Sequence, residues 1–140
     1  MKKSIRGQSL FEVIVTLLVV SLVVTAIAGL AILGIKSSNF SRDKTLATRY
    51  VQEANEWLRG ERDTDWTAFK SNSQAHATIC LQTLGWPGTC GAINNIFTRK
   101  ADFVFPPDGS IQATVTVSWT DSGGTHLSQS ITYFSDWQNK

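Results

Sequence analysis

The chain has 140 residues, which is enough for one ordinary domain at most. Its formal net charge is +2, but three of its 13 lysines and arginines lie in the first seven residues, and the other ten are outnumbered by 11 aspartates and glutamates. This balance leaves no basic stripe along which a phosphate backbone would bind, so the sequence does not indicate a nucleic-acid partner.

The N-terminal region is a short basic leader followed by a long apolar run. Lys2, Lys3 and Arg6 precede residues 13–35, which include no charged side chain. As a helix rising about 1.5 Å per residue, this run extends about 35 Å, enough to cross the hydrocarbon core of a bilayer. Because the positive cluster lies on its N-terminal side, the positive-inside rule places the N-terminus in the cytoplasm and the remainder of the chain outside.

Glu12 interrupts this plain anchor pattern. It directly precedes the apolar run and follows Leu10 and Phe11. A carboxylate at the centre of a membrane costs about 2.5–3.5 kcal/mol, and less near the interface. Glu12 is therefore a candidate functional residue, and its role requires a positively charged partner.

The stretch RGQSLFEV, from Arg6 to Val13, resembles the prepilin peptidase signature of type IV pilins and type II secretion pseudopilins. It has a short basic leader ending in Gly7, then four residues, then Glu12, then a long apolar helix. The resemblance implies cleavage between Gly7 and Gln8 and N-methylation of the new amine on Gln8. It also implies that Glu12 neutralises the N-terminal amine of a neighbouring subunit during filament assembly. Gln8 departs from the Phe or Met that usually follows the cleaved bond.

The same resemblance implies a structural subunit, more consistent with a minor than a major pilin, and not an enzyme. The implied partners are other pilin subunits, a prepilin peptidase, the pilus assembly machinery and the membrane, with no cofactor. The implied location is the cytoplasmic membrane, crossed once with the N-terminus inside, and then a filament at the cell surface. The expected division of the chain is a leader peptide at 1–7, a transmembrane or filament-core helix at 8–35, an amphipathic helix half at 36–60 and a β domain at 61–140.

Two other interpretations of the N-terminus stay open. A secretory signal also has basic residues before an apolar stretch, and Ala26-Ile27-Ala28 would supply a cleavage site that starts the mature protein at Gly29. An uncleaved signal anchor would retain Met1. Under either interpretation the β domain belongs to a secreted or membrane-anchored binding protein. An extracellular enzyme is the least favoured alternative, because the sequence contains no GxSxG, no phosphate loop and no zinc-spaced cluster.

Beyond Lys36 apolar residues recur at helical spacing, which predicts an amphipathic helix packed on its own domain. Gly60 follows Arg59 and predicts the end of that helix. We therefore expect one helix from about Gln8 to Arg59, with its first half in lipid or a filament core and its second half beneath a sheet. The apolar stripe consists of Phe40, Ala47, Tyr50, Val51, Ala54, Trp57 and Leu58.

The remainder of the chain predicts a small antiparallel sheet, so the expected fold class is α+β. Asp121-Ser122-Gly123-Gly124 predicts a hairpin turn, and a return strand follows it with Leu127, Ile131 and Tyr133. The run VTVSWTDSGGTH at 115–126 resembles the closing hairpin of minor pilins related to the PilV type. Strands are expected at 76–83, 95–105 and 111–120, the last alternating with Ala113, Val115, Val117 and Trp119 on one face.

Cys80 and Cys90 are the two cysteines of the chain, and they lie in a loop-like stretch. Neither belongs to a CxxC or has a Cys or His neighbour at metal-ligand spacing. In an exported domain this pair predicts a disulfide that closes a short loop, with two free thiols as the alternative. Such a disulfide contributes roughly 2–3 kcal/mol in the chain-entropy account.

Asp63 and Asp65 lie in a polar segment at 62–67, which is expected to be a turn with Trp66 and Phe69 as anchors. Calcium ligation is one interpretation of the two aspartates. A full oxygen-ligand loop is missing, however, so helix capping or a turn is favoured and no metal site is predicted.

Overall fold

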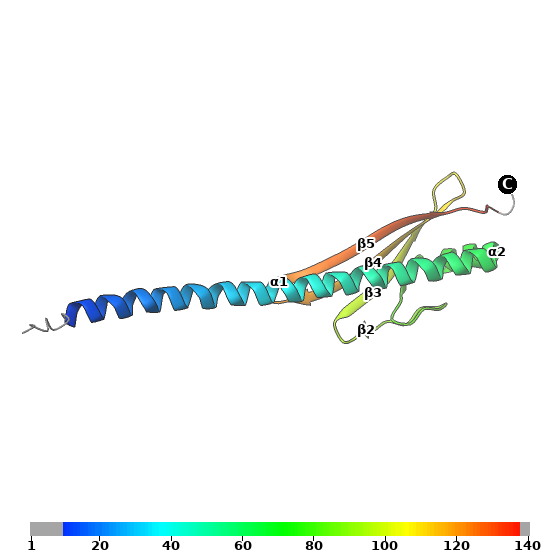
Figure 1. The fold of residues 1–140 in the computed structure, drawn as a ribbon. Helices are drawn as coiled ribbons and strands as arrows, with labels where there is room; N and C mark the ends of the chain where they lie inside the picture. The colour runs from blue at the N-terminus through cyan, green and yellow to red at the C-terminus, as the bar shows by residue number, and fades with distance from the viewer. Residues whose placement is uncertain (1–9, 138–140) are drawn as a thin grey trace, which may run out of the picture. The chain divides into compact units, whose positions relative to one another are not determined.

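The computed structural model describes residues 10–137 and has the α+β class expected from the sequence. By its contacts the chain divides into two units, Met1–Phe40 and Ser41–Lys140. Helix α1 belongs to both units, and the described strands all lie in the second (Figure 1). The elements are α1 (Leu10–Thr64), α2 (Trp66–Ala75), β1 (Thr78–Cys80), β2 (Ala92–Ile93), β3 (Phe97–Val104), β4 (Ile111–Asp121) and β5 (Gly124–Phe134).

In the first unit α1 is an apolar helix whose side chains are exposed from Leu10 to Asn39. The hydroxyl groups within its apolar run, those of Thr16, Ser21 and Thr25, bond back to the helix backbone, so they add no unsatisfied polar group to an apolar surface. Thr16 Oγ1 donates to the Glu12 carbonyl at 2.7 Å, and Thr25 Oγ1 donates to the Ser21 carbonyl at 2.8 Å. The helix is therefore self-sufficient in hydrogen bonds while its apolar surface is uncovered.

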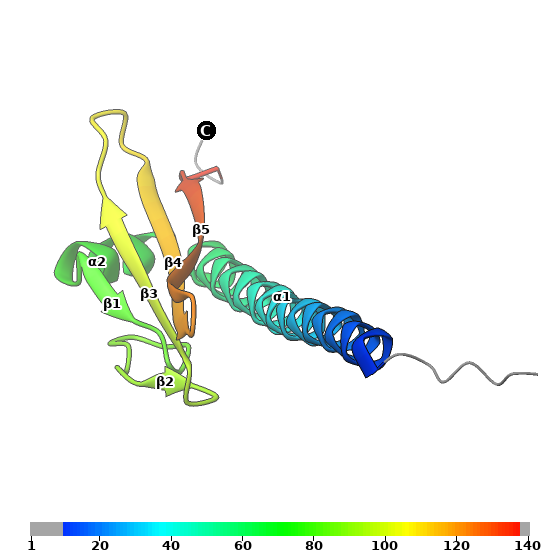
Figure 2. The same cartoon turned by 90° about the vertical axis from the view of Figure 1, so that its left-hand side faces the viewer.

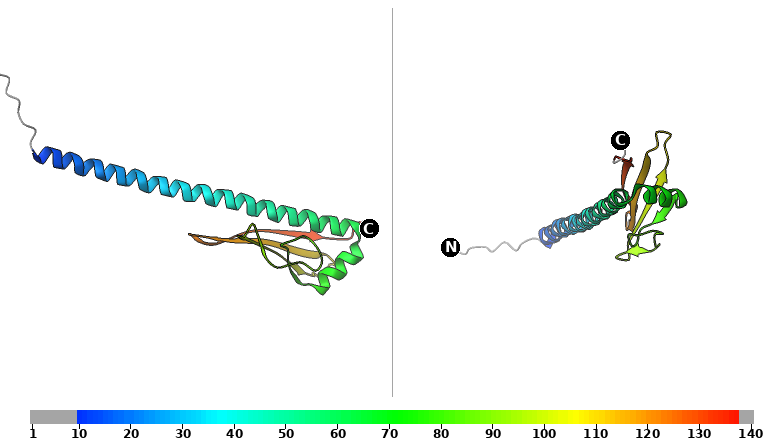
Figure 3. Two further views of the ribbon diagram at one scale, coloured as in Figure 1. Left: turned by 90° about the horizontal axis from the view of Figure 1, so that it is seen from below. Right: turned by 90° about the vertical axis from the view of Figure 1, so that its right-hand side faces the viewer.

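In the second unit α1 packs along one face of the sheet, as predicted (Figure 3). The buried residues Ala47, Val51, Ala54 and Leu58 recur every three or four positions and so form one helical face. The two alanines have small side chains, which allow the helix backbone to approach the strands closely. The same face contains one buried amide, Asn55, which is 7% exposed.

Helix α1 ends at Thr64, so the predicted end at Arg59 is wrong. Gly60 lies inside the helix, where its carbonyl accepts a hydrogen bond from Thr64 Oγ1 at 2.8 Å. The carboxylate of the following residue, Glu61, accepts a hydrogen bond from the Trp86 indole nitrogen at 2.8 Å. A hydrogen bond to a charged group contributes about 1.5–3 kcal/mol. This exceeds the roughly 1 kcal/mol that glycine costs relative to alanine in a helix.

The turn expected at 62–67 is also wrong, because a second helix begins inside it. Asp65 has an extended conformation, with φ −156° and ψ 102°, and its carboxylate accepts a hydrogen bond from the Ala68 amide at 2.9 Å. This is N-cap geometry, one of the two roles that the sequence favoured for Asp65. Capping starts α2 at Trp66 and places Phe69, which is 1% exposed, in the core.

The sheet is antiparallel, with strand order β1-β3-β4-β5 and with β2 also paired to β3 (Figure 2). Of the strand expected at 76–83 only β1, Thr78–Cys80, forms, and β2 was not predicted. β4 and β5 are joined by the predicted hairpin, whose pairing runs from Ile111 and Phe134 to Asp121 and Gly124. The two short strands β1 and β2 are both on the side of β3 away from β4, so β5 is the opposite edge.

The core lies between α1, α2 and the inner face of the sheet. In β4 every second residue is buried, and Ala113, Val115, Val117 and Trp119 share one face as predicted. An aromatic cluster closes the α2 end of this core around Phe69. Its ring lies 5.3 Å from Phe134, 6.2 Å from Trp86 and 6.4 Å from Phe103, measured between ring centroids.

Along most of its length β5 presents small hydroxyl residues to the helix, and only Phe134 at its end places a large apolar side chain in the core. Ser128 Oγ lies 3.3 Å from Thr48 Oγ1 of α1, and Thr132 Oγ1 donates to Asn55 Oδ1 at 3.5 Å. On the opposite face of β5 the side chains of Leu127, Ile131 and Tyr133 are 55–63% exposed. The helix therefore meets β5 through small hydroxyl side chains, which fit beneath a closely packed α1.

Candidate functional site

The N-terminal candidate site is described from Leu10 onward, and Gly7 and Gln8 lie outside the described residues. Glu12 is exposed in the first turn of α1, where a negative charge interacts favourably with the helix dipole. Among residues 10–137 no side chain forms a hydrogen bond or ion pair with the Glu12 carboxylate. It is surrounded on the helix by exposed apolar residues, including Phe11 at 73% and Val13 at 47%.

The apolar segment that follows Glu12 is a continuous run of exposed side chains. By length and composition α1 contains one segment, near the N-terminus, that is capable of crossing a membrane. Its large side chains from Val13 to Ile35 are 43–70% exposed. A helix that is apolar on every side requires lipid or other apolar helices around it, because water would be in contact with its whole surface otherwise.

The predicted disulfide is present. Cys80 and Cys90 are bonded, with an S–S distance of 2.01 Å and a Cα–Cα distance of 4.8 Å. The two ends of the segment that it closes are also joined by a backbone hydrogen bond, in which the Gln82 backbone N–H donates to the Thr89 carbonyl at 3.0 Å. Gly88 makes this possible: a Cβ atom there would lie 1.8 Å from the Cys80 carbonyl oxygen.

The disulfide loop is anchored to the helices through Trp86, whose peptide bond to Pro87 is cis. Its ring lies 5.2 Å from that of Trp57 on α1 and 5.8 Å from that of Phe103 on β3. Its indole nitrogen is the donor to Glu61. The loop is thus part of the aromatic core, whereas the sequence indicated only a loop-like stretch around the two cysteines.

A buried arginine was not predicted. Arg99 is 2% exposed on β3, and its Nη1 forms an ion pair with the Glu53 carboxylate of α1 at 2.8 Å. Arg99 Nε donates to the Leu81 carbonyl at 2.8 Å, and Nη1 also donates to the Tyr50 carbonyl at 3.0 Å. Since Thr98-Arg99-Lys100 has the appearance of an ordinary polar strand segment, nothing local distinguishes Arg99 as the inward-facing residue.

The two aspartates considered as calcium ligands have other partners. Asp65 caps α2, and Asp63 pairs with Arg62 at 2.7 Å while it accepts a hydrogen bond from the Trp137 indole at 3.2 Å. The Trp137 hydrogen bond, followed by the Arg62 contacts, lowers the pKa of Asp63 below its ordinary value. Within residues 10–137 no group of three or more His, Cys, Asp or Glu side chains is arranged to hold a metal ion.

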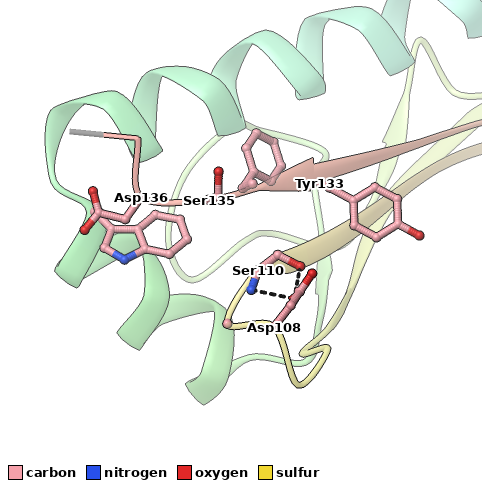
Figure 4. A pocket seen from close by; sticks show the side chains of 8 residues that line it. Asp108, Ser110, Tyr133, Ser135 and Asp136 are labelled. Carbon is pink, nitrogen blue, oxygen red and sulfur yellow. Dashed lines mark hydrogen bonds between the residues drawn. The ribbon is translucent and has the colours of Figure 1, made fainter. Parts of the chain in front are cut away.

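A cleft lies at the end of the second unit where three segments meet, and we refer to it as the acidic cleft (Figure 4). Its volume is about 510 Å³. The pKa of Asp108 is below its ordinary value because the Ser110 hydroxyl and backbone N–H both donate to its carboxylate. The lining residues are Trp66, Asp108, Gly109, Ser110, Tyr133, Phe134, Ser135 and Asp136.

Comparison with known proteins adds no relative to this description: no protein-family model, no curated protein and no solved structure matches the chain.

Proposed function

We propose that this protein is a structural subunit of a type IV pilus-like filament, with the character of a minor pilin or pseudopilin. It is held in the cytoplasmic membrane by the apolar half of α1, with its N-terminus inside and its disulfide-bonded β domain outside. A prepilin peptidase cleaves it between Gly7 and Gln8. The processed helix then leaves the lipid and packs among the helices of neighbouring subunits.

The observation that carries this proposal is the position of Glu12 at the start of an uncovered apolar helix. Moving that carboxylate into a helix bundle without a partner is expensive, because desolvation costs several kcal/mol per ion. The free amine that cleavage creates on Gln8 of a second copy would supply the partner. A pair formed in a low-dielectric bundle is also stronger than one in water, so it would fix the axial register between subunits.

The extracytoplasmic location of the second unit is supported by its chemistry. A disulfide persists in oxidising compartments outside the cytosol. Here the bond between Cys80 and Cys90 closes a loop whose Trp86 belongs to the core, which supports a structural role for the disulfide. A cytoplasmic ATPase is the motor that such an assembly implies.

The first test is the N-terminus of the mature protein. The full chain is produced with and without a prepilin peptidase, purified from membranes in detergent, and analysed by intact mass and N-terminal peptide mapping. We expect a chain that begins at methylated Gln8 only when the peptidase is present. A chain that begins at Gly29 indicates a secretory signal, and a chain that retains Met1 in the presence of the peptidase indicates a plain anchor. Either result rejects the proposal.

The second test separates processing from assembly. Glu12→Val is expected to leave membrane insertion intact and to reduce incorporation into filaments, measured by immunoblotting of sheared surface fractions. Leu17→Val is the matched control, because it changes an exposed apolar residue of the same helix without altering charge. If Glu12→Val and Leu17→Val both incorporate like the unmodified chain, the proposed role of Glu12 is wrong.

A further inference from the structure

The acidic cleft joins residues that are far apart in the sequence. Trp66 comes from the start of α2, residues 108–110 from the loop between β3 and β4, and residues 133–136 from the end of β5. In Figure 4 Asp136 lies at one end of the view and Tyr133 at the other, with Asp108 and Ser110 between them. The volume of about 510 Å³ is within the range of small-molecule and side-chain binding pockets.

The charge of the cleft is negative. Among residues 10–137 its lining contains the carboxylates of Asp108 and Asp136 and no lysine, arginine or histidine. Asp108 is fixed in place, because its Oδ1 accepts hydrogen bonds from the Ser110 backbone nitrogen at 2.9 Å and from Ser110 Oγ at 2.7 Å. Both of these bonds reach the same oxygen, which leaves Oδ2 available to a donor from a ligand.

Two of the residues that line the cleft, Tyr133 and Trp66, carry aromatic rings with exposed surface. Tyr133 is the penultimate residue of β5 and lines the cleft together with the two aspartates. Its side chain is 63% exposed. The Trp66 ring is half-buried and is supported from behind by Phe69, with 6.0 Å between the ring centroids. Aromatic faces attract cations, whereas an anion would be repelled by the two carboxylates and a purely apolar ligand would desolvate them.

Beside the cleft the chain places a guanidinium group of its own. Arg62 packs near Trp66 and Asp136, and its guanidinium carbon lies 5.6 Å from the centroid of the Phe134 ring. Arg62 also pairs with Asp63. Its charge offsets part of the negative charge near Asp136, so Asp108 is the carboxylate with which an incoming cation would pair.

We propose that the acidic cleft binds a guanidinium group, with Asp108 as its ion-pair partner and with Tyr133 and Trp66 as its aromatic walls. A planar guanidinium both stacks on aromatic rings and donates to a carboxylate, which an ammonium group does less well. The group belongs either to an arginine side chain of another polypeptide or to a free guanidinium compound. This inference does not rest on the filament role, because none of its residues lies in the apolar half of α1.

The test is a titration of the ¹⁵N-labelled full chain in a non-ionic polyoxyethylene detergent, followed by amide chemical shifts. The two ligands are N-acetyl-arginine amide and its neutral isostere N-acetyl-citrulline amide. We expect saturable shifts at residues 108–110 and 133–136 with the arginine compound only. A glycine- and serine-flanked arginine peptide distinguishes the sources: tighter binding of the peptide indicates a polypeptide ligand, and equal binding indicates a free compound.

Variants assign the binding to the named residues. Asp108→Asn retains the oxygen that accepts from Ser110 and removes the charge, so we expect roughly three- to tenfold weaker binding. Tyr133→Leu is expected to weaken binding and Tyr133→Phe to preserve it. Glu56→Gln is the matched control, because it removes one negative charge from an exposed position on α1 whose side chain is 68% accessible.

Three results would overturn the proposal. One is binding of the citrulline compound as tightly as the arginine compound, which would indicate that charge is not recognised. Another is an unchanged dissociation constant in Asp108→Asn, with the amide spectrum showing that the chain is folded. The third is the absence of saturable shifts in this cleft when the arginine compound is raised through the millimolar range.

Discussion

The Arg99 guanidinium on β3 connects to Glu53 on α1 through an ion pair of 2.8 Å in which one partner is buried and the other is half in solvent. The side chain of Arg99 is 3% exposed and that of Glu53 is 53% exposed. Solvent therefore weakens the ion pair itself, and the larger contribution comes from the two backbone carbonyls that Arg99 satisfies. These belong to Tyr50 and Leu81, on two different segments.

This asymmetry predicts different costs for the two partners. Arg99→Met leaves the Leu81 carbonyl without its side-chain donor in the interior and removes the second donor to the Tyr50 carbonyl, so it is expected to lower the free energy of unfolding by about 1–3 kcal/mol. Glu53→Gln is expected to cost no more than about 1 kcal/mol, because its carboxylate is largely solvated. Denaturant unfolding of the full chain in non-ionic detergent measures both. Arg59→Met is the control, since Arg59 pairs with Glu56 on the surface. Equal losses at Arg99 and Glu53 would contradict this account.

Removal of the disulfide is also expected to lower the stability of the chain. Replacing both Cys80 and Cys90 with serine is expected to lower the free energy of unfolding by roughly 2–3 kcal/mol, because the open loop gains conformational entropy in the unfolded chain. Reduction of the unmodified chain with dithiothreitol should reproduce the loss. The double variant serves as its own control, since the reductant should not affect it. A reductant effect of similar size in the double variant would refute the assignment.

Gly88 and Gly85 form a matched pair within the disulfide loop. Gly88→Ala places a Cβ atom 1.8 Å from the Cys80 carbonyl oxygen, whereas Gly85→Ala meets nothing within 4 Å. The first change is expected to destabilise the chain by about 1–3 kcal/mol through forced backbone movement, and the second to be close to neutral. Thermal unfolding of the two variants side by side measures the difference. Similar melting temperatures would show that the loop adjusts freely.

Acid pH is expected to break the contact between Asp63 and Trp137. The pKa of Asp63 is lowered in the folded chain below its ordinary value of 3.8, first by the Trp137 hydrogen bond and then by Arg62. Its contribution to stability is therefore fully present above pH 3.8 and is lost as the pH falls through the lower folded value. Asp63→Asn should show a smaller loss of unfolding free energy between about pH 5 and pH 2 than the unmodified chain.

The companion variant Trp137→Phe removes the same hydrogen bond from the other side and should also reduce the acid-dependent loss. Some acid sensitivity is expected to persist in both variants, because Asp108 and Asp121 also have pKa values below the ordinary range. Asp121 is held by His126, with 2.9 Å between Oδ1 and Nε2, and by the Gly123 amide. If both variants retain the full acid-dependent loss, Asp63 does not contribute to it.

The sequence alone determined those features that depend on near neighbours along the chain. Charge and hydropathy marked the apolar segment after Glu12, helical spacing marked the buried face of α1, and alternation marked the inner face of β4. The turn at Ser122-Gly123 was predictable because its residues suit a tight hairpin. The cysteine pair was predictable because its spacing suited a short closed loop and no metal pattern competed with it.

Tertiary structure decided what depends on residues that are distant in the chain. Gly60 did not end α1, because Glu61 receives its hydrogen bond from Trp86, which lies 25 residues further along. Arg99 became an interior residue because carbonyls from two other segments surround it. The acidic cleft exists only where α2, a loop and the end of β5 converge. Local patterns specify which elements form, but the partner of each polar group is fixed when those elements pack.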